Sequence, residues 1–397
     1  MPANQSLSFL LIGNHAVSLT NFRTPLMRQL VADGHRVTAV VPLNDLDAPT
    51  IQKVRDTLMQ LGVELVPVDL ARTGLGPIAD IAYMLALRRV IAKVRPDRIM
   101  AYAVKPAIYA GLASRMLGHR HYYPMLSGLG YAFTDGGGIK KKAVRMMVSG
   151  LLRASFGGAN TAIFQNPDDE KLMRAEGILP PATKSAVVSG SGIDRALFAP
   201  APLTEIPGNP AFLMVCRVMI DKGVREFAQA AAMVKQRHPN ARFRLLGALD
   251  AANPAAIGVD EIRTWTAVDY LGSSDDVRPY LRDCDAFVLP SFYREGIPRS
   301  ALEALSVGRA IVTTDHPGCR ETVVEGENGF LVPVRDAAAL ANAFERLITA
   351  PQLFVRMGER SLELARTRFD VNIVNREMLT IMNMQGPAQP VTSPTAG

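Results

Sequence analysis

Apolar runs of strand length alternate with longer amphipathic segments along most of the chain. The apolar runs are rich in Val, Ile and Leu, as at Leu7 to Ile12, which is typical of strands buried on both faces of a sheet. The longer segments carry apolar residues at helical spacing, as at Phe22, Leu26 and Leu30. The alternation predicts an α/β architecture in which helices cover both faces of parallel sheets.

The predicted elements fall into two successive groups. In the first group we expect strands at Leu7 to Ile12, Arg36 to Val41, Val63 to Val68, Arg98 to Ala103 and His121 to Met125. Its helices are expected at about Asn21 to Ala32, Pro77 to Val94 and Pro106 to Met116, with a loop at Gly13 to Thr20. In the second group we expect strands at Ala211 to Cys216, Phe243 to Leu246, Tyr270 to Leu271 and Ala286 to Leu289, and helices at Val224 to Gln236, Pro298 to Leu305, Ala337 to Ile348 and about Val371 to Met382.

The length of 397 residues indicates two domains, and a Pro-rich stretch from Phe198 to Pro210 is the natural linker. We therefore predict a first domain at residues 1–200 and a second at residues 201–370. We expect a helix at 371–384 that packs back on the first domain, and a disordered tail at 385–397.

Composition narrows the class of protein. No apolar stretch reaches the roughly 18 residues of a membrane-spanning helix, and the first residues lack the basic segment of a signal peptide. The three cysteines, Cys216, Cys284 and Cys319, form no pairing or metal pattern, which fits a reducing cytoplasm. The loop after the first strand lacks the G-x-G-x-x-G fingerprint, which disfavours a dehydrogenase.

The net charge of +7 is concentrated in the first half of the chain. Residues 1–200 carry 23 Lys and Arg against 14 Asp and Glu, which suits an anionic partner. A helix after Gly138 carries Lys140, Lys141, Lys142 and Arg145 beside apolar side chains. Such a helix fits the headgroup layer of an anionic membrane, although an ordinary helix with solvated charges remains an alternative. No recognised motif supports nucleic-acid binding.

One stretch, Phe292 to Leu305, follows an apolar strand and leads into a helix. The unpaired N–H groups and the partial positive charge of the helix N-terminus suit a diphosphate. Gly296 allows close approach of the backbone to a ligand, and Glu295 can accept hydrogen bonds from sugar hydroxyls. Glu303 lies eight residues further on and is placed to hold a second hydroxyl pair, such as that of a ribose. Taken alone, both residues could equally be solvated surface carboxylates.

Four segments resolve that ambiguity through a family resemblance. The Glu-x7-Glu stretch EGIPRSALE, the run from Gly308 to Thr314, the run from Gly318 to Glu321 and the run from Gly326 to Val332 together resemble the donor domain of family 4 retaining glycosyltransferases. The resemblance implies the GT-B fold, in which two Rossmann-like domains face each other across a cleft. It implies a hexosyltransferase that uses a nucleotide sugar.

The resemblance also implies a set of site residues. The segment from Arg217 to Gly223 is similar to an R-x4-K-G motif, so Arg217 and Lys222 would hold the donor diphosphate and Glu295 would grip the donor sugar as the third catalytic residue. The further residues expected to bind the donor are Gly13, Ser18, Gly192, Val277, Gly296, Ile297, Pro298 and Glu303.

Two segments of the first half, Tyr102 to Tyr109 and Ser127 to Phe133, resemble a bacterial subgroup of the family that builds lipid-linked glycans and exopolysaccharides. The N-acetylgalactosaminyltransferases that act on undecaprenyl-diphosphate-linked bacillosamine are similar. This resemblance implies a UDP-N-acetylhexosamine or UDP-hexose donor and a polyprenyl-diphosphate-linked acceptor at the inner face of the cytoplasmic membrane. Lys105, Lys140, Lys141, Lys142 and Arg145 would then contact the acceptor or the membrane.

We expect no cofactor and no metal. The one Asp-x-Asp pattern of the second half, Asp283 to Asp285, lies just before a strand, where packing or capping explains it. Three histidines, His15, His119 and His121, have no assignable role on the acceptor side. A soluble acceptor, a sugar-nucleotide-binding protein without transfer activity, and a sugar-nucleotide epimerase stay open as alternatives.

Overall fold

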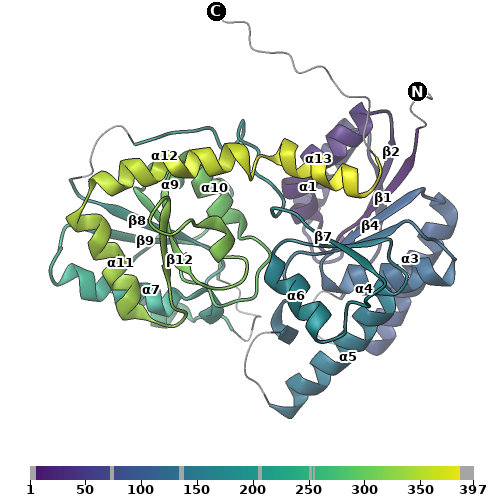
Figure 1. Cartoon of the computed structure of the whole chain (residues 1–397), viewed down its shortest axis with the longest axis horizontal. Helices are drawn as coiled ribbons and strands as arrows, with labels where there is room; N and C mark the ends of the chain where they lie inside the picture. The colour runs from purple at the N-terminus through teal and green to yellow at the C-terminus, as the bar shows by residue number, and fades with distance from the viewer. Residues whose placement is uncertain are drawn as a thin grey trace, which may run out of the picture.

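The computed structural model describes residues 6–71, 76–133, 138–203, 208–249, 253 and 255–384. They form two α/β halves that lie side by side, each built on a parallel sheet (Figure 1). The predicted two-sheet α/β architecture is confirmed. The tail predicted at 385–397 lies outside the described residues.

The first sheet has seven parallel strands in the order β3-β2-β1-β4-β5-β6-β7. Its strands are β1 (Ser8–Ile12), β2 (Arg36–Val41), β3 (Glu64–Pro67), β4 (Arg98–Tyr102), β5 (Tyr122–Leu126), β6 (Thr161–Phe164) and β7 (Lys184–Val187). Its helices are α1 (Ala16–Ala32), α2 (Ala48–Gln60), α3 (Pro77–Val94), α4 (Val104–Met116), α5 (Ile139–Phe156) and α6 (Pro167–Ala175). The helices fall on both faces, because one apolar cluster includes α3, α4 and α5 and another includes α1 and α2.

The second sheet has six parallel strands in the order β10-β9-β8-β11-β12-β13. They are β8 (Ala211–Val215), β9 (Arg242–Leu246), β10 (Asp269–Tyr270), β11 (Ala286–Leu289), β12 (Ala310–Thr314) and β13 (Gly329–Val332). The accompanying helices are α7 (Val224–Lys235), α8 (Val259–Arg263), α9 (Arg278–Arg282), α10 (Arg299–Val307), α11 (Ala337–Thr349) and α12 (Gln352–Thr367). Single 3-10 turns occur at Tyr131–Phe133, Ile220–Lys222 and Arg320–Thr322.

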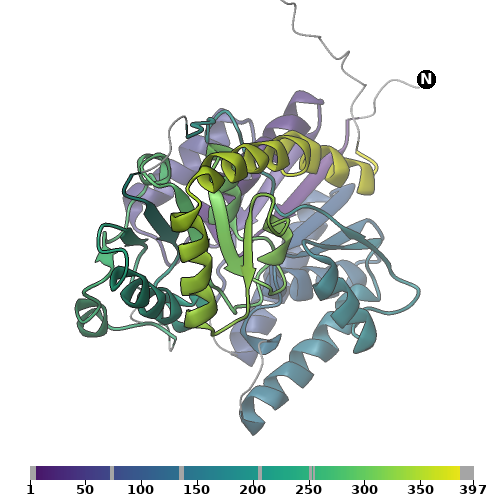
Figure 2. The same cartoon turned by 60° about the vertical axis from the view of Figure 1, so that its left-hand side comes forward.

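The last helix, α13 (Val371–Ile381), leaves the second half and lies beside α1 of the first (Figure 1). The buried side chains Val374 and Met378 belong to the same apolar cluster as Leu26 and Leu30 of α1. Figure 2 shows the last two helices, in yellow, running from one half of the molecule to the other. The two halves are therefore joined by the linker and also by the returning C-terminal helix.

Some predicted boundaries are wrong. The stretch Gly13 to Thr20 was expected to be a loop, but α1 already begins at Ala16, because the ring of His15 accepts a hydrogen bond from the Ser18 N–H and caps the helix. Helices α2, α6, α8, α9 and α12 and strands β6, β7, β12 and β13 were not predicted. Helix α10 begins at Arg299 with Pro298 as its N-cap, and Gly308 at φ +88° ends it, as expected.

Among the described residues, no helix is both long and apolar enough to span a bilayer.

Candidate active site

At the carboxyl edges of the two parallel sheets, loops of one domain meet loops of the other, because Gly128, after β5, lies against the Glu295–Gly296 backbone, after β11. Ligands of parallel α/β sheets bind at this edge. The loop after β11, which carries Glu295, and the turn after β8, which carries Lys222, lie next to each other because β8 and β11 are paired strands. The Nζ of Lys222 lies 2.7 Å from Oε1 of Glu295.

The turn that holds Lys222 is fixed by backbone contacts to the neighbouring loop. The carbonyl of Asp221 accepts hydrogen bonds from the N–H groups of Phe292 and Tyr293, at 2.9 and 3.0 Å. Gly223 adopts φ +77°, and a Cβ at this position would overlap with the carbonyl of Pro290. Only glycine fits there, and this explains why a Lys-Gly pair follows the strand.

The Lys222–Glu295 pair is largely buried, and the carboxylate affects the pKa of the lysine. Burial alone would lower the pKa of Lys222, but the Glu295 carboxylate beside it raises that pKa above its usual value. Oε1 of Glu295 also accepts a hydrogen bond from the Ser291 hydroxyl at 3.0 Å. The Lys222 ammonium lies 5.0 Å from the centroid of the Tyr293 ring. The site thus holds a fixed ammonium and a fixed carboxylate at one point.

Arg217 follows β8 directly and is exposed at the same edge. Val277 lies at the carboxyl edge as well, as the N-cap of α9 after β10, where it is half-buried against the core. The structure thus places Arg217, Lys222 and Val277 along one edge of the second sheet.

Gly296 and Ile297, which with Pro298 are predicted to bind the donor, also contact the first domain. A Cβ at Gly296 would overlap with Oε1 of Gln165 and lie 2.9 Å from the carbonyl carbon of Ser127, both in the first domain. The Ile297 N–H donates to Oε1 of Gln165 at 3.4 Å. The close approach that Gly296 permits is therefore an approach of the two domains to each other.

Glu303, which is predicted to hold the ribose hydroxyls, is paired with an arginine of its own helix. Its Oε1 lies 3.1 Å from Nε of Arg299, one turn earlier in α10. Burial raises the pKa of Glu303 to about 7, although the Arg299 charge opposes this shift. Arg299 also donates to the carbonyl of Gly192 and, at 3.4 Å, to the hydroxyl of Ser191.

The three first-domain positions predicted for the donor have clear local roles. Gly13 packs against the ring of Tyr102, which a Cβ would overlap. Ser18 and His15 cap α1 together, with Nδ1 of His15 2.9 Å from Oγ of Ser18. Gly192 adopts φ +68° and lies against the Val371 backbone, where the chain crosses between the domains. Gly13 and His15 lie at the carboxyl end of β1, close to the edge that faces the second domain.

A cleft of about 300 Å³ opens between the domains beside Tyr293. Its first-domain wall is formed by Asn14, Lys105, Ser127 and Gly128, among others. The Lys105 ammonium contacts a carboxyl oxygen of Asp80 at 2.9 Å and the carbonyl of Ala71 at 2.8 Å. Lys105 thus lines the cleft, with its charge already paired.

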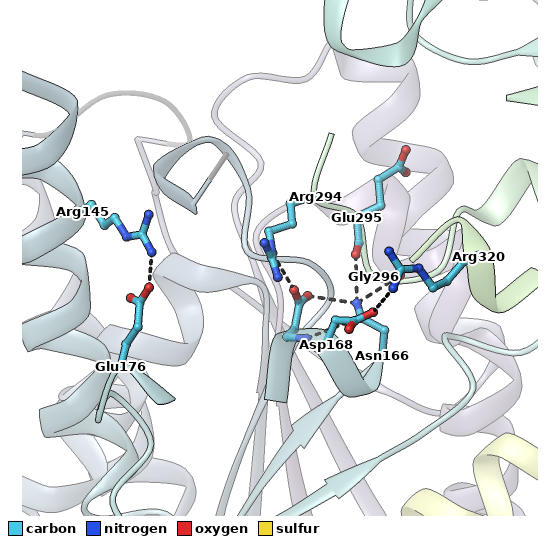
Figure 3. A network of polar contacts seen from close by, with 9 residues as sticks. Arg145, Asn166, Asp168, Glu176, Arg294, Glu295, Gly296 and Arg320 are labelled. Carbon is cyan, nitrogen blue, oxygen red and sulfur yellow. Dashed lines mark hydrogen bonds and ion pairs between the residues drawn. The ribbon is translucent and has the colours of Figure 1, made fainter. Parts of the chain in front are cut away.

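The basic residues of α5 differ in exposure and in their contacts. Lys140 and Lys142 are exposed, and the neighbouring Ile139 is 87% exposed. Lys141 is half-buried. Arg145 forms an ion pair with Glu176, at the end of α6, and lies over the Phe133 ring (Figure 3). Arg145 is therefore bound within the domain.

The histidines His119 and His121 precede β5 and lie at the amino end of the sheet. The Nε2 of His119 contacts the carbonyl of Pro96 at 2.7 Å. Both residues are therefore at the edge opposite to the cleft.

The sequence reasoning missed residues of the first domain that reach the second. Gln165 and Asp169 contact the loop that carries Glu295. Asn166 contacts the same loop, and Asp168 contacts Arg320 (Figure 3). A usable signal was present, because Asn166-Pro167-Asp168-Asp169 directly after a strand is a helix-start pattern at the ligand-binding edge of a sheet.

In the part of the chain that the structure describes, no three His, Cys, Asp or Glu side chains come together in a group that could hold a metal ion.

Comparison with known families identifies both domains. Residues 21–190 match the family described as "Glycosyl transferase 4-like domain", and residues 209–350 match "Glycosyl transferases group 1". The chain belongs to these glycosyltransferases. The predicted enzyme class and the family resemblance are confirmed, and the two-domain arrangement is the GT-B fold.

Among the relatives of this glycosyltransferase is the N,N'-diacetylbacillosaminyl-diphospho-undecaprenol alpha-1,3-N-acetylgalactosaminyltransferase of Campylobacter jejuni. It is 29% identical over 93% of this chain and 96% of its own length. The UDP-Gal:alpha-D-GlcNAc-diphosphoundecaprenol alpha-1,3-galactosyltransferase of Escherichia coli is 24% identical over 68% of this chain and 71% of its own. An Anabaena protein solved in complex with UDP has a TM-score of 0.72 at 17% identity, with 96% of this chain and all of that chain covered.

Proposed function

We propose that this glycosyltransferase moves a sugar, with retention of configuration, from a UDP-hexose or UDP-N-acetylhexosamine to a polyprenyl-diphosphate-linked glycan. The observation that carries the proposal is the buried Lys222–Glu295 pair at the edge where the two sheets face each other. The names of the Campylobacter and Escherichia relatives, which specify undecaprenyl-diphosphate acceptors, support the acceptor class.

In this proposal the second domain holds the donor. The Lys222 ammonium has three N–H donors and uses one for Glu295, which leaves donors for a phosphate oxygen. Lys222, Arg217 and the first turn of α10 stabilise the charge that builds on the departing diphosphate. Glu295 accepts hydrogen bonds from the transferred sugar, and Glu303 binds the ribose next to Arg299.

The reaction needs one bond broken and one formed. The bond between C1 of the sugar and the diphosphate oxygen breaks as an acceptor hydroxyl oxygen attacks C1 from the same face. The hydroxyl proton passes to the departing phosphate oxygen. Since positively charged side chains stabilise the leaving group, we propose that transfer needs neither a metal nor a cofactor.

The acceptor would enter from the first domain. The cleft of about 300 Å³ between Tyr293 and the loops after β1, β4 and β5 gives its terminal sugar a place beside Tyr293, in the loop that carries Glu295. The net positive charge of residues 1–200 favours a diphosphate-linked acceptor.

A membrane contact through α5 would present the acceptor. Helix α5 lies at the outer edge of the first domain (Figure 1). Its exposed side chains combine charge and apolar surface, since Lys140 and Lys142 accompany Ile139 and Met146, which are 87% and 74% exposed. In this proposal the enzyme works on the inner face of the cytoplasmic membrane, where nucleotide sugars are available.

The test is release of nucleoside diphosphate from a panel of nucleotide sugars, with and without a lipid extract of the native membrane. Release from one UDP-sugar that depends on the extract is the expected result. Release that is indifferent to the extract would favour a soluble acceptor or epimerase-like hydrolysis. Folded protein that releases nothing from any donor would favour a sugar-nucleotide-binding protein.

A further inference from the structure

Two side chains at the start of α6 hold the catalytic loop of the opposite domain. Asn166 and Asp169 follow β6 in the first domain, and both are fully buried. Their partners, Arg294, Glu295 and Gly296, belong to the loop after β11 in the second domain (Figure 3).

The Asn166 side chain both caps α6 and binds the other domain. Its Oδ1 accepts a hydrogen bond from the Asp169 N–H at 2.8 Å and so caps α6. Its Nδ2 donates across the domain boundary to the carbonyls of Glu295 and Gly296, at 3.1 and 3.4 Å. The second task is separable from the first, because capping needs only an acceptor oxygen.

Asp169 brings a charge to the same boundary. Its Oδ1 accepts from Nε of Arg294 at 3.0 Å, and its Oδ2 accepts from Nδ2 of Asn166 at 3.0 Å. Burial raises the pKa of Asp169, and the hydrogen bonds from Arg294 and Asn166 oppose this shift. Loss of such a partner would leave a buried carboxylate unpaired, which costs free energy. The Arg294 contact therefore favours the arrangement in which the domains meet.

These contacts fix Glu295 from both sides. Lys222 and Ser291 of the second domain hold its carboxylate, whereas Asn166 of the first domain holds its backbone carbonyl. Parting of the domains would remove the hold on the backbone but leave the hold on the carboxylate.

We propose that Asn166 and Asp169 are positioning residues for sugar transfer, which hold the Glu295–Gly296 peptide in its catalytic place only when the domains are together. The inference rests on the proposed role of Glu295. Because reacting groups displaced by about 1 Å can lose roughly a hundredfold in rate, loss of this hold acts on turnover and not on donor binding.

Two variants separate this role from a purely structural one. Asn166→Ser keeps an oxygen that caps α6 but removes the donor that reaches the second domain. Arg294→Gln removes the charge that pairs with Asp169 and leaves the first domain unchanged, so it tests the contact even if the first variant fails to fold. Glu170→Gln is the control, because Glu170 pairs with Arg174 and Ser185 within the first domain.

The measurements are kcat and KM for the nucleotide sugar, together with the radius of gyration from small-angle X-ray scattering with UDP present. We expect Asn166→Ser and Arg294→Gln to lower kcat by roughly ten- to a hundredfold, to leave KM within about twofold, and to increase the radius of gyration. Glu170→Gln should match the wild type in all three.

Unchanged kcat and unchanged scattering in both variants would overturn the inference, and so would a rise in KM without a fall in kcat. If the wild type transfers no sugar, the proposed function fails, but the scattering comparison still decides whether these residues hold the domains together.

Discussion

The ammonium of Lys222 and the carboxylate of Glu295 lie 2.7 Å apart, with side chains only 10% and 15% exposed. They come from loops that follow two paired strands, β8 and β11. The proposed mechanism needs a positive charge at the diphosphate and an acceptor of hydrogen bonds at the sugar, on either side of the bond that breaks. This pair supplies both within one hydrogen bond.

Replacing Lys222 with Ala should therefore lower turnover by at least roughly a hundredfold, the scale on which loss of one preorganised charge stabiliser acts. Steady-state release of UDP measures the effect. Lys53→Ala is the control, because Lys53 is exposed on α2 and does not line the cleft. Near-normal turnover of a folded Lys222→Ala variant would remove Lys222 from the active site.

The three consecutive lysines of α5 give a prediction about membranes. Changing Lys140, Lys141 and Lys142 together to Glu should release the protein from anionic vesicles, because each Lys near such a surface contributes about 1 kcal/mol to binding. Sedimentation with vesicles measures this. The control changes three exposed lysines elsewhere, Lys53, Lys171 and Lys184, to Glu and so carries the same net charge. Equal sedimentation of the two triple variants would end the case for α5 as the membrane contact.

Glu303 predicts a dependence of stability on pH. Because burial raises its pKa from 4.5 to about 7 in the folded protein, the folded state keeps a proton that the unfolded chain has already lost between these values. Ionisation of Glu303 therefore destabilises the folded state. The contribution of Glu303 to the free energy of unfolding falls as the pH rises from 4.5 to about 7 and is constant above that.

Glu303→Gln should remove that contribution. We expect the free energy of unfolding of the wild type, relative to this variant, to fall between pH 4.5 and pH 7 and then to level off. Urea unfolding at several pH values measures the difference. Parallel profiles for the two proteins would show that Glu303 keeps an ordinary pKa in the folded state.

The sequence predicted those parts of the site that depend on contacts between residues close together in the chain. The strand Ala286–Leu289 and the helix that Gly308 ends were predicted, because apolar runs and capping glycines act locally. The early start of α1 was missed, because its cap is a histidine, which is not among the usual capping residues.

The contacts between the domains could not be predicted from local pattern. Asn166 and Glu295 are 129 residues apart, and each stands in a segment whose own preferences are satisfied without the other. Only the docking of the two sheets brings them together. The same holds for Gly296, because the atoms of Gln165 and Ser127 beside it belong to the other domain.

Gly296 provides the final prediction, on the contact between the domains. A Cβ added there would overlap with the end of the Gln165 side chain and press on the Ser127 backbone, so Gly296→Ala should push the domains apart. Because the backbone at Gly296 is not in the left-handed region, the substitution adds no strain within the loop itself. We expect turnover to fall by roughly tenfold or more, while the thermal unfolding midpoint changes little.

Gly150→Ala is the control, since Gly150 lies in α5 with no atom near its missing Cβ. Combining Gly296→Ala with Gln165→Ala should restore part of the lost turnover, because the flexible side chain is removed but the Ser127 backbone remains. Full activity of the single variant would mean that catalysis does not need the domains as close as they lie in this structure.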